Sequence, residues 1–239
     1  MRELFKEKSL WTATLICLIA MAGSLPFNGI ELPLSTGSFL IFFQKALDTK
    51  LLLFLLPAAA VFPMGAIFVR EFSSGFLKLY LSRIERLEYV KRKTIQIYAG
   101  GFLAFFLAGI ELLLLCFLFL YPLEITGNIS WSMVWEALSL LLRISLVGGM
   151  TAELAGVFGA LFQNYYMAYG LPFVSFYLLI ILRERYFKDM YTFYPAEWVK
   201  CEQDWGTNGV GIWVFLVVFS TVLMLFHGLV LYTRLQEIS

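Results

Sequence analysis

Charged residues are few in this chain. Of its 239 residues only 15% are Asp, Glu, Lys or Arg, whereas 60% are hydrophobic and the mean hydropathy is +0.80. Soluble domains are about 45–50% apolar, so this composition indicates an integral membrane protein. The longest polar connections are about twenty-five residues, which leaves no room for a large soluble domain beside one polytopic membrane domain.

Residue types that could catalyse a reaction or bind a metal inside a membrane are scarce as well. The sequence has one histidine, His227, and its apolar runs contain no aspartate. Intramembrane proteases need a Ser–His pair, paired Asp residues or several metal ligands. We therefore expect no catalytic residue and no metal site in this chain. His227 is interpreted as a packed, neutral side chain.

Two further absences bear on function. The sequence has no G-x-x-x-x-G-K-[ST] phosphate loop, which excludes ATP hydrolysis by this chain itself. Its three cysteines match neither a zinc site nor a disulfide framework. Cys17 and Cys116 lie in apolar runs and are interpreted as small core residues, and Cys201 lies in a polar loop.

The apolar runs predict the fold class, an all-α polytopic membrane protein of six transmembrane helices in a single domain over residues 1–239. A spanning helix takes about 20 residues. The count depends on a break at 163–166, the most polar stretch of the run 137–182. One long helix there would place the C-terminus on the other side. The predicted spans are 10–25, 51–69, 98–121, 137–162, 167–182 and 210–232.

Lysine and arginine are spread unevenly over the connections between these spans. With the N-terminus inside, eleven lie on the cytoplasmic side and six on the outer side. Cytoplasmic loops carry the excess of Lys and Arg, so we expect both termini in the cytoplasm. The basic start and Ala20–Ala22 also fit a cleavable signal peptide; we expect an uncleaved anchor helix instead.

The outer connections are too long to be bare turns. The segment 183–208 is rich in aromatic residues, whose rings settle at the headgroup level. Within it, Pro195 and Glu197 are typical of a helix start, with Pro at the first position and an acid in the first turn. We expect short interfacial helices in 183–208 and in 30–50.

The segment 70–97, between the second and third predicted spans, is the most polar part of the chain and holds seven of its eighteen Lys and Arg residues. A helix over it would have two faces, and interruptions at Gly75 and Ser82 would make it a bent arm. The predicted apolar stripe is Phe72, Phe76, Leu79, Tyr80, Ile84, Leu87 and Val90. The predicted polar face is Glu71, Gly75, Lys78, Ser82, Arg86, Tyr89 and Lys93.

The order of residues in this segment resembles the connection after the second span of ABC-2 type permeases, the membrane subunits of one class of ATP-binding-cassette transporter. The matching residues are Glu71-x-x-x-Gly75, Leu81-Ser82-Arg83 and Arg86-x-x-Tyr89-x-x-x-Lys93. In that family a Glu…Gly pair precedes a short coupling helix. The resemblance extends over the whole chain in length, number of spans and outer helices. It is closest to the small permeases of bacterial peptide-antibiotic and lantibiotic immunity and export systems.

The resemblance implies a non-catalytic permease in a bacterial plasma membrane that exports an amphipathic substrate such as a peptide antibiotic. It implies no cofactor in this chain, because ATP and Mg would be bound by a separate ATP-binding-cassette ATPase subunit. Its other partners would be a second permease, identical or similar, and membrane lipid, but no nucleic acid. The residues that would couple to the ATPase are Glu71, Gly75, Lys78, Ser82, Arg83, Arg86, Tyr89 and Lys93.

Three alternatives remain open at the level of sequence. A basic amphipathic helix can rest on anionic lipid without any protein partner. A substrate-capture subunit of a vitamin-type importer also has about six spans and works with separate ATPases. A membrane sensor or assembly protein would need no transport activity.

Ionisable and small residues within the spans complete the list of candidates. Glu111, Arg143 and Glu153 each need a partner, water or protonation, because a charge at this depth costs about 2.5–3.5 kcal/mol. We expect a Glu111–Arg143 pair and a separate place for Glu153. A four-residue repeat of small residues is expected to let helices pack closely within the subunit or at a dimer interface. Its members are Gly148, Ala152, Gly156 and Ala160.

Overall fold

The computed structural model describes residues 5, 7–23, 33–125, 127–206 and 209–238, and these residues are helical apart from turns and one isolated bridge between Leu34 and Glu124. The α-helices are α1 (Lys8–Ala22), α2 (Ser38–Leu47), α3 (Lys50–Val61), α4 (Ile67–Ser73), α5 (Phe76–Leu81), α6 (Arg86–Leu120), α7 (Trp131–Phe162), α8 (Tyr165–Arg185), α9 (Pro195–Lys200) and α10 (Val210–Ile238). Short 3-10 turns cover Tyr121–Leu123 and Tyr191–Phe193.

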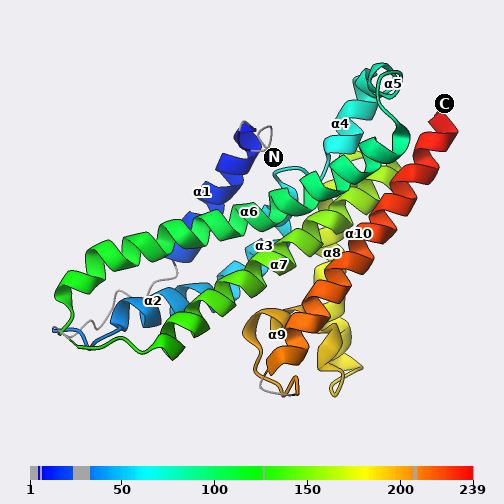
Figure 1. The fold of residues 1–239 in the computed structure, drawn as a ribbon. Helices are drawn as coiled ribbons and strands as arrows, with labels where there is room; N and C mark the ends of the chain where they lie inside the picture. Colours follow the sequence, from blue (N-terminus) through cyan, green and yellow to red (C-terminus); the bar gives the residue numbers. More distant parts are fainter. Residues whose placement is uncertain (1–4, 6, 24–32, 126, 207–208, 239) are drawn as a thin grey trace.

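Four of these helices, α6, α7, α8 and α10, are long and apolar enough to cross a membrane, so the chain is a multi-pass membrane protein. Helix α7 is the central one, because it contacts α6, α8, α10 and α3 and is the most deeply buried. The long helices run between two ends of one bundle (Figure 1).

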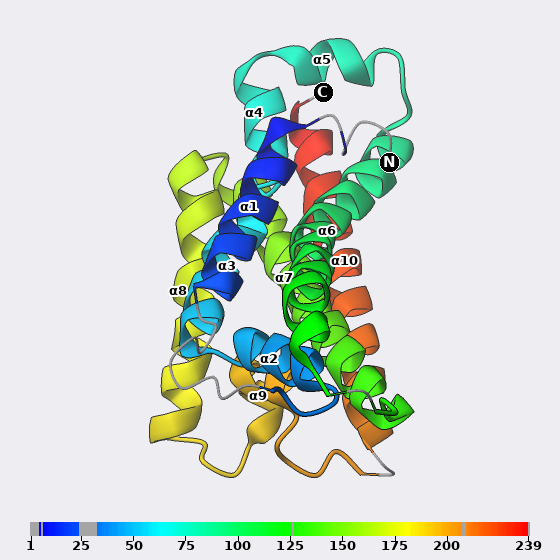
Figure 2. The ribbon, with the colours of Figure 1, turned by 90° about the vertical axis from the view of Figure 1, so that its left-hand side faces the viewer.

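The two ends differ (Figure 2). One carries α4 and α5 together with the start of α1 and the end of α10; we call residues 67–85 the arm and this end the arm end. The opposite, or far, end carries α2 and α9. These are the two short helices that the sequence predicts in 30–50 and 183–208, and α9 begins at Pro195 as expected.

The second predicted span is not a single helix, because the run 51–69 is divided into α3 and α4 by a turn over 62–66. Helix α1 covers 10–22 of the first predicted span, 10–25, whose residues 24–25 lie outside the described part of the chain. Pro63 lies in the turn over 62–66 and favours the break, because proline has no N–H to donate and its ring clashes with the carbonyl four residues earlier. Gly65, in the same turn, packs closely on Ala155 of α7. A Cβ added to Gly65 would lie 2.8 Å from the Ala155 Cβ.

The later helices follow the sequence more closely, although α6, α7 and α8 begin earlier than predicted. Helix α6 starts at Arg86 and continues from the charged segment without interruption, and α7 starts at Trp131. The predicted break between 162 and 167 is present. Gln163 has a φ of 51°, and the Asn164 side chain caps α8 by accepting the Tyr166 N–H at 2.8 Å.

The small residues of α7 pack against neighbouring helices of the same chain. An added Cβ on Gly101 of α6 would lie 2.6 Å from both the Ala152 Cβ and the Gly148 carbonyl oxygen. Gly156 lies against His227 of α10, and Ala160 is buried in a cluster with α10 and the arm. The repeat therefore serves packing within the subunit, which is the first of the two uses that its sequence predicts.

Candidate functional site: the arm

The arm is two short helices joined by a glycine hinge. Gly75 has a φ of 72°, a left-handed conformation that glycine adopts without steric cost, and it separates α4 from α5. Ser82 ends α5, and its hydroxyl donates to the Leu79 carbonyl at 2.8 Å. Both interruptions lie where the sequence indicates them, so the segment is a bent arm and not one rod.

Glu71, in the first helix of the arm, is anchored to α6. The Tyr89 hydroxyl donates to Glu71 Oε2 at 2.7 Å, and Lys93 Nζ donates to Glu71 Oε1 at 2.5 Å. The Lys93 side chain is 9% exposed and the Glu71 side chain 14%. This ion pair is largely buried, so it joins the base of the arm to the membrane helix as a fixed cross-link.

The apolar side of the arm packs on the bundle through Leu77. This residue is buried in a cluster with Tyr89 of α6, Ala160 of α7 and Leu235 of α10. The arm thus contacts three long helices at once.

The predicted apolar stripe is wrong in detail. Phe76, Leu79 and Leu87 are exposed, and Leu77, which the stripe omits, is the buried residue of α5. A single helical wheel assumes one unbroken helix. Here the hinge at Gly75 and the turn after Ser82 change the register, so residues on either side no longer share one face.

The eight predicted coupling residues divide into two groups. Three of them, Glu71, Tyr89 and Lys93, turn inward: the Tyr89 hydroxyl and the Lys93 ammonium both bind the Glu71 carboxylate. The exposed members are Gly75, Ser82, Arg83 and Arg86. The side chain of Lys78 is outside the described part of the structure. Lys91 is also exposed, and the sequence pattern did not single it out.

A cavity of about 550 Å³ opens beside the arm, between the start of α1, α4 and α6. Glu7, Arg70 and Phe76 line it together with the outer side of the Glu71–Lys93 pair. Arg70 Nη2 lies 3.3 Å from Glu7 Oε1, which ties the N-terminal helix to the arm. Both charges are substantially exposed, so this ion pair contributes little stability by itself.

The predicted Glu111–Arg143 pair is not formed between these two described side chains. Arg143 Nε instead donates to the Val199 carbonyl of α9 at 2.8 Å. Leu141 is the α7 residue that meets α6 at Gly109. Two residues further along a helix the side chain has rotated by about 200°, so Arg143 points away from α6.

Glu153 has the partner that sequence reasoning missed. His227 Nδ1 of α10 lies 2.5 Å from Glu153 Oε2, and both side chains are fully buried. The two residues are far apart in the sequence, and a lone histidine in an apolar run gives no sign of a buried acid beside it. His227 is packed, as predicted, but it is packed against a carboxyl group.

Comparison with known proteins gives no family assignment: no protein-family model, no curated protein and no solved structure matches the chain. Within the described ranges, no three residues of the types His, Cys, Asp and Glu are grouped so that they could hold a metal ion. The function must therefore be inferred from the residues and their geometry.

Proposed function

We propose that this chain is the membrane-spanning permease subunit of an ABC-2 type exporter, and that its arm docks on a separate ATP-binding-cassette ATPase. The observation that carries the proposal is the two-sided arm. Leu77 fixes α5 to the bundle, while Phe76, Leu79 and Arg83 remain exposed on α5 and the turn that follows it. Exposed apolar side chains bordered by basic ones are typical of a protein interface.

The fixed joint beneath the arm supports a coupling role. A docked ATPase can move the membrane helices only if the arm is rigidly attached to them, since a flexible connection would absorb the displacement. The Glu71–Lys93 ion pair and the Leu77 cluster provide that attachment on two sides. Coupling then follows from different arm contacts in two states of the ATPase pair.

Six crossings, both termini in the cytoplasm and a bacterial plasma membrane belong to the same proposal. Four crossings are α6, α7, α8 and α10. A fifth is suggested because Glu7 lies beside Arg70 at the arm end, whereas Leu34 pairs with Glu124 at the far end. The sixth would be the broken pair α3 and α4, which leads back to the arm. The excess of Lys and Arg at the arm end favours the cytoplasm for that side.

A single six-span chain supplies half of such a transporter. We therefore propose a second permease, identical or similar, beside it, with ATP and Mg bound by the two ATPase subunits. The cargo would be an amphipathic molecule such as a peptide antibiotic, as the resemblance implies.

Site-specific photocross-linking in the native cell tests the docking surface. A benzophenone amino acid replaces Leu79, which is 70% exposed on α5, and mass spectrometry identifies the adduct. We expect a protein with a nucleotide-binding phosphate loop. The matched control replaces Trp131, which is 78% exposed at the start of α7. A lipid adduct at position 79, or the same protein partner from both positions, would contradict the proposal.

Charge reversal tests coupling separately from binding. Arg83→Glu or Arg86→Glu should abolish stimulation of the ATPase by the permease without lowering the thermal unfolding midpoint, because both side chains are exposed. Normal transport and normal ATPase binding in both variants would reject the arm as the docking site.

A further inference from the structure

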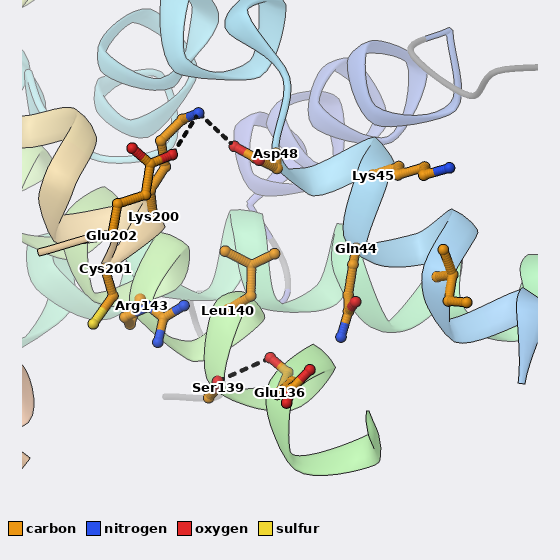
Figure 3. Close-up of a pocket in the computed structure, with 11 residues that line it drawn as sticks. Gln44, Lys45, Asp48, Glu136, Ser139, Leu140, Arg143, Lys200, Cys201 and Glu202 are labelled. Carbon is orange, nitrogen blue, oxygen red and sulfur yellow. Dashed lines mark hydrogen bonds and ion pairs between the residues drawn. The ribbon is translucent and has the colours of Figure 1, made fainter. Parts of the chain in front are cut away.

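The far end holds a second cavity, of about 490 Å³, between α2, α7 and the end of α9 (Figure 3). It lies at the other end of the bundle from the arm. Its lining combines apolar side chains, Ile41 and Leu140, with charged ones. A concave site of this size with a few polar groups suits one small or amphipathic molecule.

Arg143 is the distinctive group in this cavity. Its Nε is fixed by the Val199 carbonyl, which orients the planar guanidinium. Within the described part of the chain, no acceptor lies within hydrogen-bond distance of its two terminal nitrogens, which are free to bind a ligand. A half-buried arginine with its donors unsatisfied is matched by a carboxylate or phosphate, which accepts two parallel N–H bonds.

The neighbouring carboxylates do not take that place. Lys200 Nζ lies 3.0 Å from Asp48 Oδ1 and 3.4 Å from Glu202 Oε1, so one lysine binds two of the acids (Figure 3). Glu197, the buried acid of α9, accepts the Gln203 N–H and the Trp205 indole N–H. Asp48, Glu202 and Glu197 are thus engaged by other groups. Glu136 also lines the cavity, but no carboxylate in the described part of the chain forms an ion pair or hydrogen bond with Arg143.

We propose that this cavity binds the oxyanion head of an amphipathic molecule, a carboxylate or a phosphate, on the terminal nitrogens of Arg143. Ile41 and Leu140 contact the apolar portion next to the head. Gln44 supplies an amide on the opposite wall. The site does not depend on any ATPase, so it stands or falls independently of the proposed coupling role.

Cys201 lines the same cavity and reports on its occupancy. Cys17 and Cys116 are buried at 1% and 3% exposure, so a maleimide reacts selectively at Cys201. The full chain in phosphatidylcholine nanodiscs is labelled with N-ethylmaleimide in the presence of dodecyl phosphate, dodecanoate or inorganic phosphate. At ten times the half-protecting concentration, dodecyl phosphate should slow labelling about tenfold, since only empty sites react.

Arg143→Gln should raise the half-protecting concentration of dodecyl phosphate about tenfold or more, because charge-assisted hydrogen bonds are lost. Arg185→Gln, which removes a positive charge outside this cavity, should leave it unchanged. Protection by inorganic phosphate at the same concentration assigns the site to small soluble anions. Protection only by the alkyl-chain probes assigns it to a lipid-like amphiphile. Either result supports an oxyanion site.

Three results would overturn the proposal: no protection by any anionic probe, equal protection by neutral dodecyl maltoside, or protection that Arg143→Gln leaves unchanged. If Arg143→Gln does not fold, Gln44→Trp is the second test, because an indole at this position fills the cavity and leaves the Arg143 guanidinium unchanged. We expect it to raise the half-protecting concentration of dodecyl phosphate. An unaltered half-protecting concentration in that folded variant counts against the site.

Discussion

Lys93 shows how burial changes the meaning of a charged residue. In the sequence it is one of seven basic residues in a polar segment, and its spacing suggests a surface contact. In the structure its ammonium is paired with Glu71 beneath the arm. Removing one partner of a buried ion pair is costly because the other charge stays uncompensated.

Lys93→Glu should therefore lower the free energy of unfolding by about 3–5 kcal/mol, since it places two carboxylates together in a buried site. Thermal unfolding in detergent or nanodiscs measures this. The control is Lys91→Glu, an exposed position on the same helix, for which we expect a change within about 0.5 kcal/mol. Equal stability of the two variants would mean that the Glu71–Lys93 pair is not formed.

Cys201 lies outside the spanning helices, and its environment predicts a pH dependence. Burial raises the pKa of its thiol above the ordinary 9.0, and the charge of Arg143 acts in the opposite direction. Because the thiolate is the reactive form, alkylation should reach half its maximal rate above pH 9.0. Arg143→Gln should move that midpoint to still higher pH. The midpoint is measured by iodoacetamide kinetics. If Arg143→Gln leaves it unchanged, the Arg143 charge does not act on the Cys201 thiol.

At the scale of elements, small residues decide how closely α6 and α7 approach. Gly101 faces the backbone of Gly148, which cannot move aside as a flexible side chain can. Gly170 in α8 has the same helical environment but no atom within 4 Å of an added Cβ. Substituting alanine at each glycine therefore distinguishes the effect of close packing, at Gly101, from the effect of helix propensity alone, at Gly170.

Gly101→Ala should destabilise the protein by about 1–3 kcal/mol through overpacking. Gly170→Ala should be neutral or stabilise it by up to about 1 kcal/mol, the difference in helix propensity. Thermal unfolding of both variants provides the comparison. A harmless Gly101→Ala would show that the two helices are further apart than described.

The breaks between elements were the more predictable feature. Gly75, Ser82 and Gln163 each interrupt a helix where composition alone indicates it, because backbone preference is local. The contacts of the arm were less predictable. Its buried leucine and its Glu71 anchor depend on helices that arrive from distant parts of the chain.

For the whole molecule, the arm and the far end define opposite sides, and this predicts a labelling pattern. In a Cys201→Ser background, a cysteine at Trp131 should react with a membrane-impermeant maleimide on intact cells. A cysteine at Leu79 should react only after permeabilisation, if the excess of basic residues marks the cytoplasm. Both positions are exposed. Labelling of both from the same side would rule out this arrangement of the bundle.

The sequence by itself determined that this is a membrane protein, that helices are interrupted at Gly75, Ser82 and Gln163, and which segment is the most polar. Those properties follow from hydropathy and from local backbone preference, which need no distant neighbour. Only the tertiary structure decided that Glu153 meets His227, that Arg143 turns to α9, and that Lys93 lies beneath the arm. A side chain's partner depends on how helices rotate and cross, and that rotation is set by packing over the whole bundle.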